Sequence, residues 1–81
     1  MRLLTVQERR VLEFEERSFP LAGVKDETIV LELGMRPQRY FQILNHLIDD
    51  PRALAERPLL VKRLLRLRGE RLQARQRRSF G

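Results

Sequence analysis

This chain contains no cysteine and no tryptophan, and its 81 residues include one histidine, one tyrosine, four prolines and four glycines. Without cysteine, the chain can form neither a disulfide nor a thiolate metal site. The single histidine, His46, cannot make a metal site without carboxylate ligands. The sequence has no apolar run of about 18 residues and no recognisable signal peptide. We therefore expect a cytoplasmic protein with no metal, no cofactor and no membrane association.

Basic residues exceed acidic ones, and the excess is confined to one part of the chain. The formal net charge at pH 7 is +6. Residues 57–81 hold nine Arg or Lys against Glu70 alone, a net charge of +8, whereas residues 1–56 hold eight against ten acidic residues, a net charge of −2. Such an asymmetry indicates a polyanionic partner, and duplex DNA in the nucleoid is the first candidate.

Apolar periodicity predicts an all-α fold, and the length fits one small domain that buries roughly 60 % of its unfolded surface. The first helix is expected to begin at Thr5, because Glu8 three residues later completes a capping box. Residues 51–58 are expected to form one loose turn. The expected helices cover about residues 5–17, 25–33 and 37–49, with a fourth that starts at residue 59. Residues 1–72 would form the domain, and residues 73–81 would form a basic flexible tail or a frayed end of the last helix.

Residues 25–47 have the spacing of a helix-turn-helix, so that a three-helix core would precede the basic C-terminal helix. Ile29, Val30 and Leu33 would give the first of the two helices one apolar face. Gly34 is placed where a left-handed residue should end that helix, and Pro37 is placed where a missing N–H costs nothing. The same pattern also describes any two short packed helices in a small bundle.

The second helix of this pair has an apolar side and a polar side. Tyr40, Ile43, Leu44 and Leu47 recur at helical spacing and predict the buried side. The opposite side is polar, including Asn45, and could address base edges in the major groove. His46 has the alternative of being merely exposed. The residues expected to face bases are Arg36, Gln38, Arg39, Gln42 and His46.

The last predicted helix has an apolar stripe that fades along the chain. Leu60, Leu64 and Leu67 keep a spacing of four and three residues, and the next place on the stripe is Arg71. The surrounding cations exceed what solubility requires and are predicted to bind phosphates, although a charge run can also be a solvated face. The residues expected to contact phosphates are Lys62, Arg63, Arg66, Arg68, Arg71, Arg75, Arg77 and Arg78.

No combination of residues predicts an enzyme. Glu13, Glu15 and Glu16 lie in one helix, but no nucleophile, phosphate loop or histidine partner occurs at a catalytic spacing. These carboxylates predict a solvated acidic face. Tyr40 and Phe41 could stack on bases, as in single-strand binders, but their position on the apolar stripe favours core packing.

The stretch from Gly34 to Ile43 resembles the turn and recognition helix of region 4 in bacterial housekeeping-type sigma factors. Those proteins have a similar order of glycine, a hydrophobic residue, arginine, a hydrophobic residue, glutamine and isoleucine. The resemblance implies a helix that reads a promoter element in the major groove, with Arg39 and Gln42 at the matching positions. The chain departs from the pattern at Arg36, where sigma factors usually have a Thr or Ser N-cap.

The whole chain is similar to a group of small actinobacterial proteins classed as a domain of unknown function. The similarity rests on Leu4-Thr5 with Glu8-Arg9, on Gly34 to Asn45, and on Leu60 to Arg68. It implies a cytoplasmic actinobacterial protein that handles DNA, and it brings no activity or site.

The sequence therefore predicts a duplex DNA-binding helix-turn-helix protein, either a small transcriptional regulator or a nucleoid-associated protein. The leading alternative is a protein-interaction module that binds RNA polymerase or a sigma factor through the acidic first helix. In that case the Leu60, Leu64 and Leu67 stripe would be a homodimer seam. A third alternative is shape-selective RNA binding through the arginine-rich tail.

Overall fold

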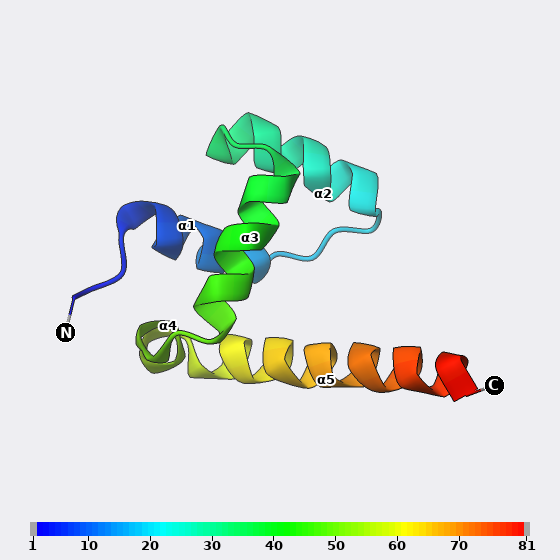
Figure 1. Ribbon diagram of the computed structural model, residues 1–81. Coiled ribbons are helices and arrows are strands. Elements are labelled where there is room, and N and C mark those ends of the chain that lie inside the picture. Colours follow the sequence, from blue (N-terminus) through cyan, green and yellow to red (C-terminus); the bar gives the residue numbers. More distant parts are fainter. Residues whose placement is uncertain (1, 81) are drawn as a thin grey trace.

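The computed structural model describes residues 2–80, with side chains up to residue 78. Every regular element in this part of the chain is a helix, which confirms the all-α class (Figure 1). Residues 16–21 form an irregular segment between α1 and α2, and the later helices are joined by short turns (Figure 1). In chain order the elements are α1 (Val6–Glu15), α2 (Ala22–Thr28), the π-helical segment η1 (Ile29–Leu33), α3 (Pro37–Ile48), α4 (Pro51–Glu56) and α5 (Pro58–Phe80).

Helix α1 begins with the predicted capping box. The Thr5 Oγ1 accepts from the Glu8 N–H at 3.1 Å, and the Glu8 Oε1 accepts from the Thr5 N–H at 2.8 Å. Two otherwise unpaired donors at the helix start are thereby satisfied. The helix ends at Glu15, about two residues earlier than expected. The chain turns there so that Phe19 stacks on Phe14, with ring centroids 5.2 Å apart.

Helix α2 starts at Ala22, three residues before the expected position, and its N-cap Leu21 has no side chain that can accept a cap hydrogen bond. The helix continues into η1, whose wider turn changes which side chains face inward. Ile29 is fully buried, but Val30 is 48 % exposed. The expectation that Val30 belongs to the buried face is therefore wrong.

Gly34 ends η1 in the left-handed conformation that the sequence predicted, with φ 65°. We expect Gly34→Ala to lower the free energy of unfolding by about 1–2 kcal/mol, because a Cβ is disfavoured at this φ. Gly69 in the exposed middle of α5 has no such constraint, and a Cβ would meet nothing there. Gly69→Ala should therefore stabilise the protein by about 0.5–1 kcal/mol. Urea unfolding measures the change in the free energy of unfolding for both variants, which should be a loss for Gly34→Ala and a gain for Gly69→Ala. A gain for both variants would contradict the assignment of strain to Gly34.

Helix α3 is the centre of the fold, and it packs against α1, η1, α4 and α5. Pro37 occupies its first turn, as predicted. Tyr40, Ile43, Leu44 and Leu47 are all buried, which confirms the predicted apolar side. The buried core comprises Leu4, Val11, Leu12, Phe14, Ile29, Tyr40, Ile43, Leu44, Leu47, Ile48, Ala53, Leu60 and Val61.

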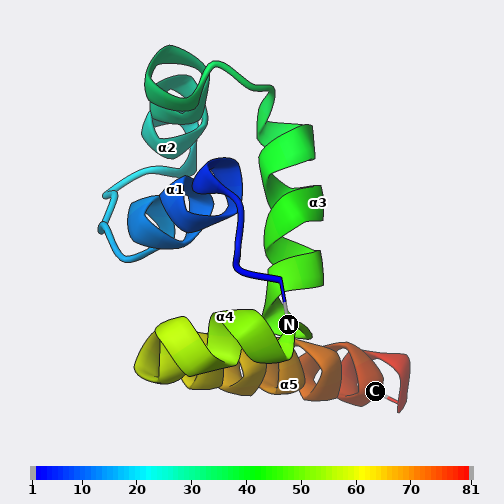
Figure 2. The same ribbon diagram turned by 90° about the vertical axis from the view of Figure 1, so that its left-hand side faces the viewer.

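Residues 51–56 form the helix α4 rather than the expected loose turn. The Asp50 side chain caps it by accepting from the Arg52 N–H at 2.9 Å. Helix α5 then crosses below the C-terminal end of α3, and its C-terminal half extends away from α1 and α4 (Figures 1 and 2). The sequence left two possibilities open for residues 73–81, a frayed helix or a flexible tail, and residues 73–80 continue α5 as helix.

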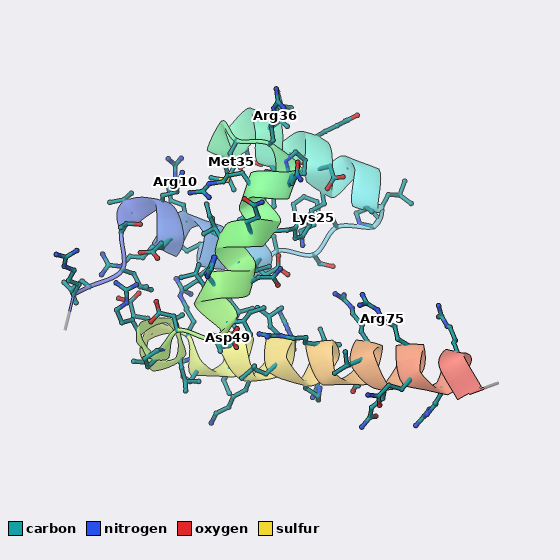
Figure 3. All side chains as sticks on the ribbon, in the orientation of Figure 1. Arg10, Lys25, Met35, Arg36, Asp49 and Arg75 are labelled. Carbon is teal, nitrogen blue, oxygen red and sulfur yellow. The ribbon has the colours of Figure 1, made fainter. Side chains whose placement is uncertain are left out.

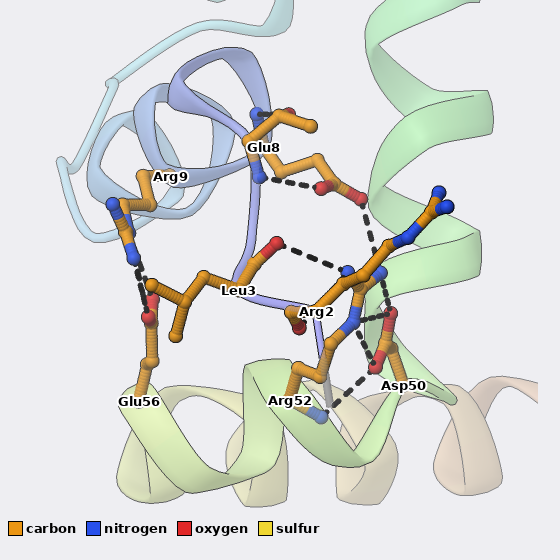
Figure 4. Close-up of polar contacts among 8 residues, drawn as sticks. Arg2, Leu3, Glu8, Arg9, Asp50, Arg52 and Glu56 are labelled. Carbon is orange, nitrogen blue, oxygen red and sulfur yellow. Dashed lines mark hydrogen bonds and ion pairs between the residues drawn. The ribbon is translucent and has the colours of Figure 1, made fainter.

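Ion pairs connect α4 to the N-terminal part of the chain (Figure 4). Arg9 pairs with Glu56, with Nη2 and Oε1 3.0 Å apart. Arg52 Nη2 lies 2.7 Å from Asp50 Oδ2, and its Nη1 donates to the Leu3 carbonyl at 3.2 Å. These side chains are partly exposed, so each pair alone contributes little. Together they fix the position of α4 beside the start of α1.

Two of these carboxylates make stability depend on pH. Hydrogen bonds from Arg52 lower the pKa of Asp50 below its ordinary 3.8, and a hydrogen bond from Arg9 lowers the pKa of Glu56 below its ordinary 4.5. A lowered folded-state pKa stabilises the fold above the unfolded-state pKa, and this contribution is lost as pH falls through the folded-state pKa. We expect the Asp50→Asn, Glu56→Gln double variant to melt below the wild type at neutral pH.

The difference between the two melting temperatures should shrink as pH falls below about 4. Asn retains an oxygen that can cap α4, so the double variant removes charge while it keeps the cap. Melting followed by circular dichroism over a pH series is the measurement. A difference that stays constant with pH would show that the two charges do not carry the effect.

Candidate nucleic-acid interface

The outward side of α3 carries the residues that the sequence expected to face bases. Gln38, Arg39, Gln42 and His46 are all exposed, and so is Asn45 on the same helix. Arg36 is exposed as well, as the N-cap of α3, but its side chain makes no cap hydrogen bond. All five predicted residues are thus accessible at or near one side of one helix.

A part-buried hydrogen-bond cluster fixes the rotation of α3. Tyr40 is fully buried, its ring meets Phe14 edge-on at 5.5 Å, and its hydroxyl donates to Glu15 Oε1 at 2.6 Å. Lys25 Nζ lies 2.7 Å from the same oxygen. Burial, followed by the hydrogen bond to Glu15, raises the pKa of Tyr40 above its ordinary 10.0, so the hydroxyl remains a donor. Glu15 is therefore a structural contact, and the expectation that it belongs to a solvated acidic face is wrong.

A cleft of about 370 Å³ lies between α3 and the C-terminal half of α5. Its apolar surface includes Phe41 and Leu72, and its cations come from both walls. Figure 3 shows Arg75 pointing from α5 toward the side of the molecule on which Lys25 lies. The lining residues are Glu15, Lys25, Phe41, Leu44, Asn45, Ile48, Leu64, Arg68, Arg71, Leu72 and Arg75. Asn45 joins the cleft to the polar side of α3.

The cations expected to contact phosphates divide between the sides of α5. Arg68, Arg71 and Arg75 line the cleft and recur at a spacing of three and four residues, which places them on one side of the helix. Arg78 continues this spacing. The other five do not line the cleft: Lys62, Arg63, Arg66, Arg77 and Arg78. A single duplex beside α3 therefore cannot contact all eight equally.

Two of these cations have acidic neighbours. Arg68 Nη2 lies 3.2 Å from Asp49 Oδ1, which ties α5 to the end of α3. Arg66 pairs with Glu70 along α5, with Nε and Oε1 3.9 Å apart. Both pairs are exposed, so a polyanion could compete for either arginine at small cost.

The sequence interpretation missed Lys25 as a cleft residue. Lys25 belongs to α2, which is separated from α5 by α3 and α4 along the chain. Its position depends on the long-range pair with Glu15 and on the approach of its Nζ to the Phe41 ring at 5.6 Å. A local pattern contains no information on such a contact, so only the folded chain reveals it.

The fold and this surface describe a small all-α protein with an exposed polar helix beside a cationic cleft. The profile of a family described as proteins of unknown function, DUF3263, matches residues 3–76, and the chain belongs to this family. No curated protein and no solved structure matches it. Among the described helices, none has the length and apolarity together that a membrane crossing requires.

Proposed function

We propose that this protein binds duplex DNA as a helix-turn-helix protein and acts as a small transcriptional regulator or a nucleoid-associated protein. In this proposal α2 with η1 is the first helix of the motif, Gly34 forms the turn, and α3 enters the major groove. The observation that carries the proposal is the accessible polar side of α3, where Arg39 and Gln42 are both exposed. Arginine and glutamine can make paired hydrogen bonds to guanine and adenine.

The cleft side of α5 supplies the second element of the proposal. Arg68, Arg71 and Arg75 form a cationic row beside the C-terminal end of α3. Cations beside a recognition helix position a protein on the backbone of the duplex and make its affinity depend on salt. We assign phosphate contact to these three and to Arg78, and we assign no contact to the cations on the other sides of α5.

The alternative of a protein-interaction module through the first helix has less support. The proposed homodimer seam needs Leu60 and Leu64 to be free, but Leu60 is buried in the core of its own chain and Leu64 packs against that core. Two acidic residues of α1 also have internal partners, since the Glu15 carboxylate accepts from the Tyr40 hydroxyl and the Glu8 carboxylate accepts from the Thr5 N–H.

Substitutions on α3 test base recognition. After selection of a preferred sequence from random duplexes, Arg39→Ala and Gln42→Ala should each cost about 1–3 kcal/mol on the selected duplex and less on random duplex. The reason is that only the selected duplex presents the matching base edges. Arg75→Ala should lower the affinity for the selected duplex and for random duplex alike, because phosphates are the same in every sequence. Fluorescence anisotropy titration at fixed salt provides the affinities.

Gln73→Ala is the matched control for Gln42→Ala, because Gln73 is an exposed glutamine on α5 that does not line the cleft. Gln73→Ala should leave the affinities for the selected duplex and for random duplex unchanged. Unchanged binding by both α3 variants would remove α3 from the interface. Single-stranded RNA of equal length is included, and tighter binding to RNA than to duplex DNA would favour RNA as the partner.

A further inference from the structure

The outer side of α2 and η1 exposes apolar side chains that the core does not use. Leu31 is 83 % exposed, and Val24 and Val30 are each a little less than half exposed. Glu27 is exposed on the same short segment, and it has no ion pair within the described residues. We call Val24, Glu27, Val30 and Leu31 the outer α2 face. Apolar side chains gathered on one helix side can mark a protein interaction surface.

The cleft between α3 and α5 has the complementary properties. Phe41 and Leu72 are 40 % and 56 % exposed, so apolar surface remains open inside it. Arg71 on the α5 wall makes no ion pair with any residue that the structure describes. The lining also includes Lys25, whose charge is shared with Glu15. The cleft therefore combines an apolar floor with an excess of positive charge.

We infer that the cleft of one copy of this chain receives the outer α2 face of a second copy. Leu31 would cover the exposed parts of Phe41 and Leu72, and Glu27 would approach Arg71. The two contacting surfaces differ, so the association is head-to-tail and leaves one cleft and one outer α2 face free at the ends. Copies can then add in a row.

Charge and polarity together favour a second copy over a nucleic acid as the occupant of the floor of the cleft. A phosphate backbone would satisfy the arginines of α5 but would leave Phe41 and Leu72 without an apolar partner. The outer α2 face supplies both an apolar residue and an acidic one. The surfaces are small, so the association is expected to be weak and concentration-dependent.

The test is sedimentation velocity of the full chain without DNA, over a series of concentrations from micromolar to millimolar. The wild type should show a mass that rises with concentration. Leu31→Gln replaces the apolar side chain of the outer α2 face with a neutral polar one, and Leu72→Glu places a carboxylate inside the cleft. Each variant alone should remain a monomer. An equimolar mixture should form a dimer that does not grow further, because each variant retains the surface that the other lacks.

Leu59→Gln is the matched control, since Leu59 is a highly exposed leucine outside both surfaces, and this variant should associate like the wild type. Circular dichroism melting verifies that the exposed substitutions leave the fold intact. A wild type that stays monomeric throughout would overturn the inference, and so would a mixture of the two variants that stays monomeric. Normal association by Leu72→Glu, together with loss of its DNA affinity, would identify the duplex as the occupant of the cleft. Arg71 serves both proposals, so a bound duplex and a second copy would compete for it, and association is therefore measured without DNA. The inference does not rest on DNA binding, so the two proposals can fail separately.

Discussion

Tyr40→Ala is expected to lower the free energy of unfolding by about 3–5 kcal/mol, the largest loss of stability from any single substitution considered for this chain. The side chain is fully buried and is among the largest side chains in the core. Its ring meets Phe14 and Phe41 edge-on, with centroids 5.5 Å and 5.1 Å away. Removal of the ring leaves a cavity at the point where α3 contacts α1. Because small domains have little stability to lose, we expect a largely unfolded variant.

Tyr40→Phe is the matched comparison, because it keeps the ring and removes only the hydroxyl. The cost should be about 1–2 kcal/mol, since Glu15 loses one hydrogen-bond partner but keeps Lys25. Urea unfolding, with helix content read by circular dichroism, measures both variants. A Tyr40→Ala variant that unfolds at the same urea concentration as Tyr40→Phe would mean that the ring contributes little to the core.

Local patterns in the sequence were sufficient for the features that depend on neighbours along the chain. The capping box of Thr5 and Glu8, the left-handed Gly34 and the position of Pro37 were each predicted and confirmed. Each depends on residues no more than four positions apart. The buried side of α3 was confirmed for the same reason, because helical spacing alone decides which side chains share a face.

Other features depend on contacts between distant parts of the chain and were missed. The segment after Pro51 became the helix α4, which packs on the core through Ala53 and pairs with α1 through Glu56 and Arg9. The Asp50 cap before Pro51 was a local indication of this helix, and the sequence interpretation gave it too little weight. The role of Glu15 could not be found locally, because its partner Tyr40 lies 25 positions further along the chain.

The candidate site likewise has one part that local sequence predicts and one part that it does not. The exposed side of α3 could be predicted from periodicity alone. The division of the α5 cations could not be predicted, because it requires knowledge of which side of α5 faces α3. Leu64 lies against the core and lines the cleft, and this contact turns Arg68, Arg71 and Arg75 toward α3.

The largest expected effect on DNA binding comes from the α5 cations that line the cleft. The Arg71→Gln, Arg75→Gln double variant should bind random duplex about tenfold to a hundredfold more weakly than the wild type near physiological salt. Both residues line the cleft wall that the proposal places on phosphates. Because the variant removes two cations from the phosphate backbone, the slope of log affinity against log salt should fall by about 2. Titrations at several salt concentrations provide both quantities.

The Lys62→Gln, Arg66→Gln double variant is the matched control. It removes the same charge at the same spacing of four residues along α5, but neither residue lines the cleft. If position on the helix decides binding, this variant keeps the wild-type slope, because every cation assigned to phosphate is still present. Equal losses of affinity in the two double variants would mean that net charge alone attracts the duplex, and the proposed orientation of α5 on DNA would then be wrong. A stronger loss in the control would place the duplex on the side of α5 that faces away from α3.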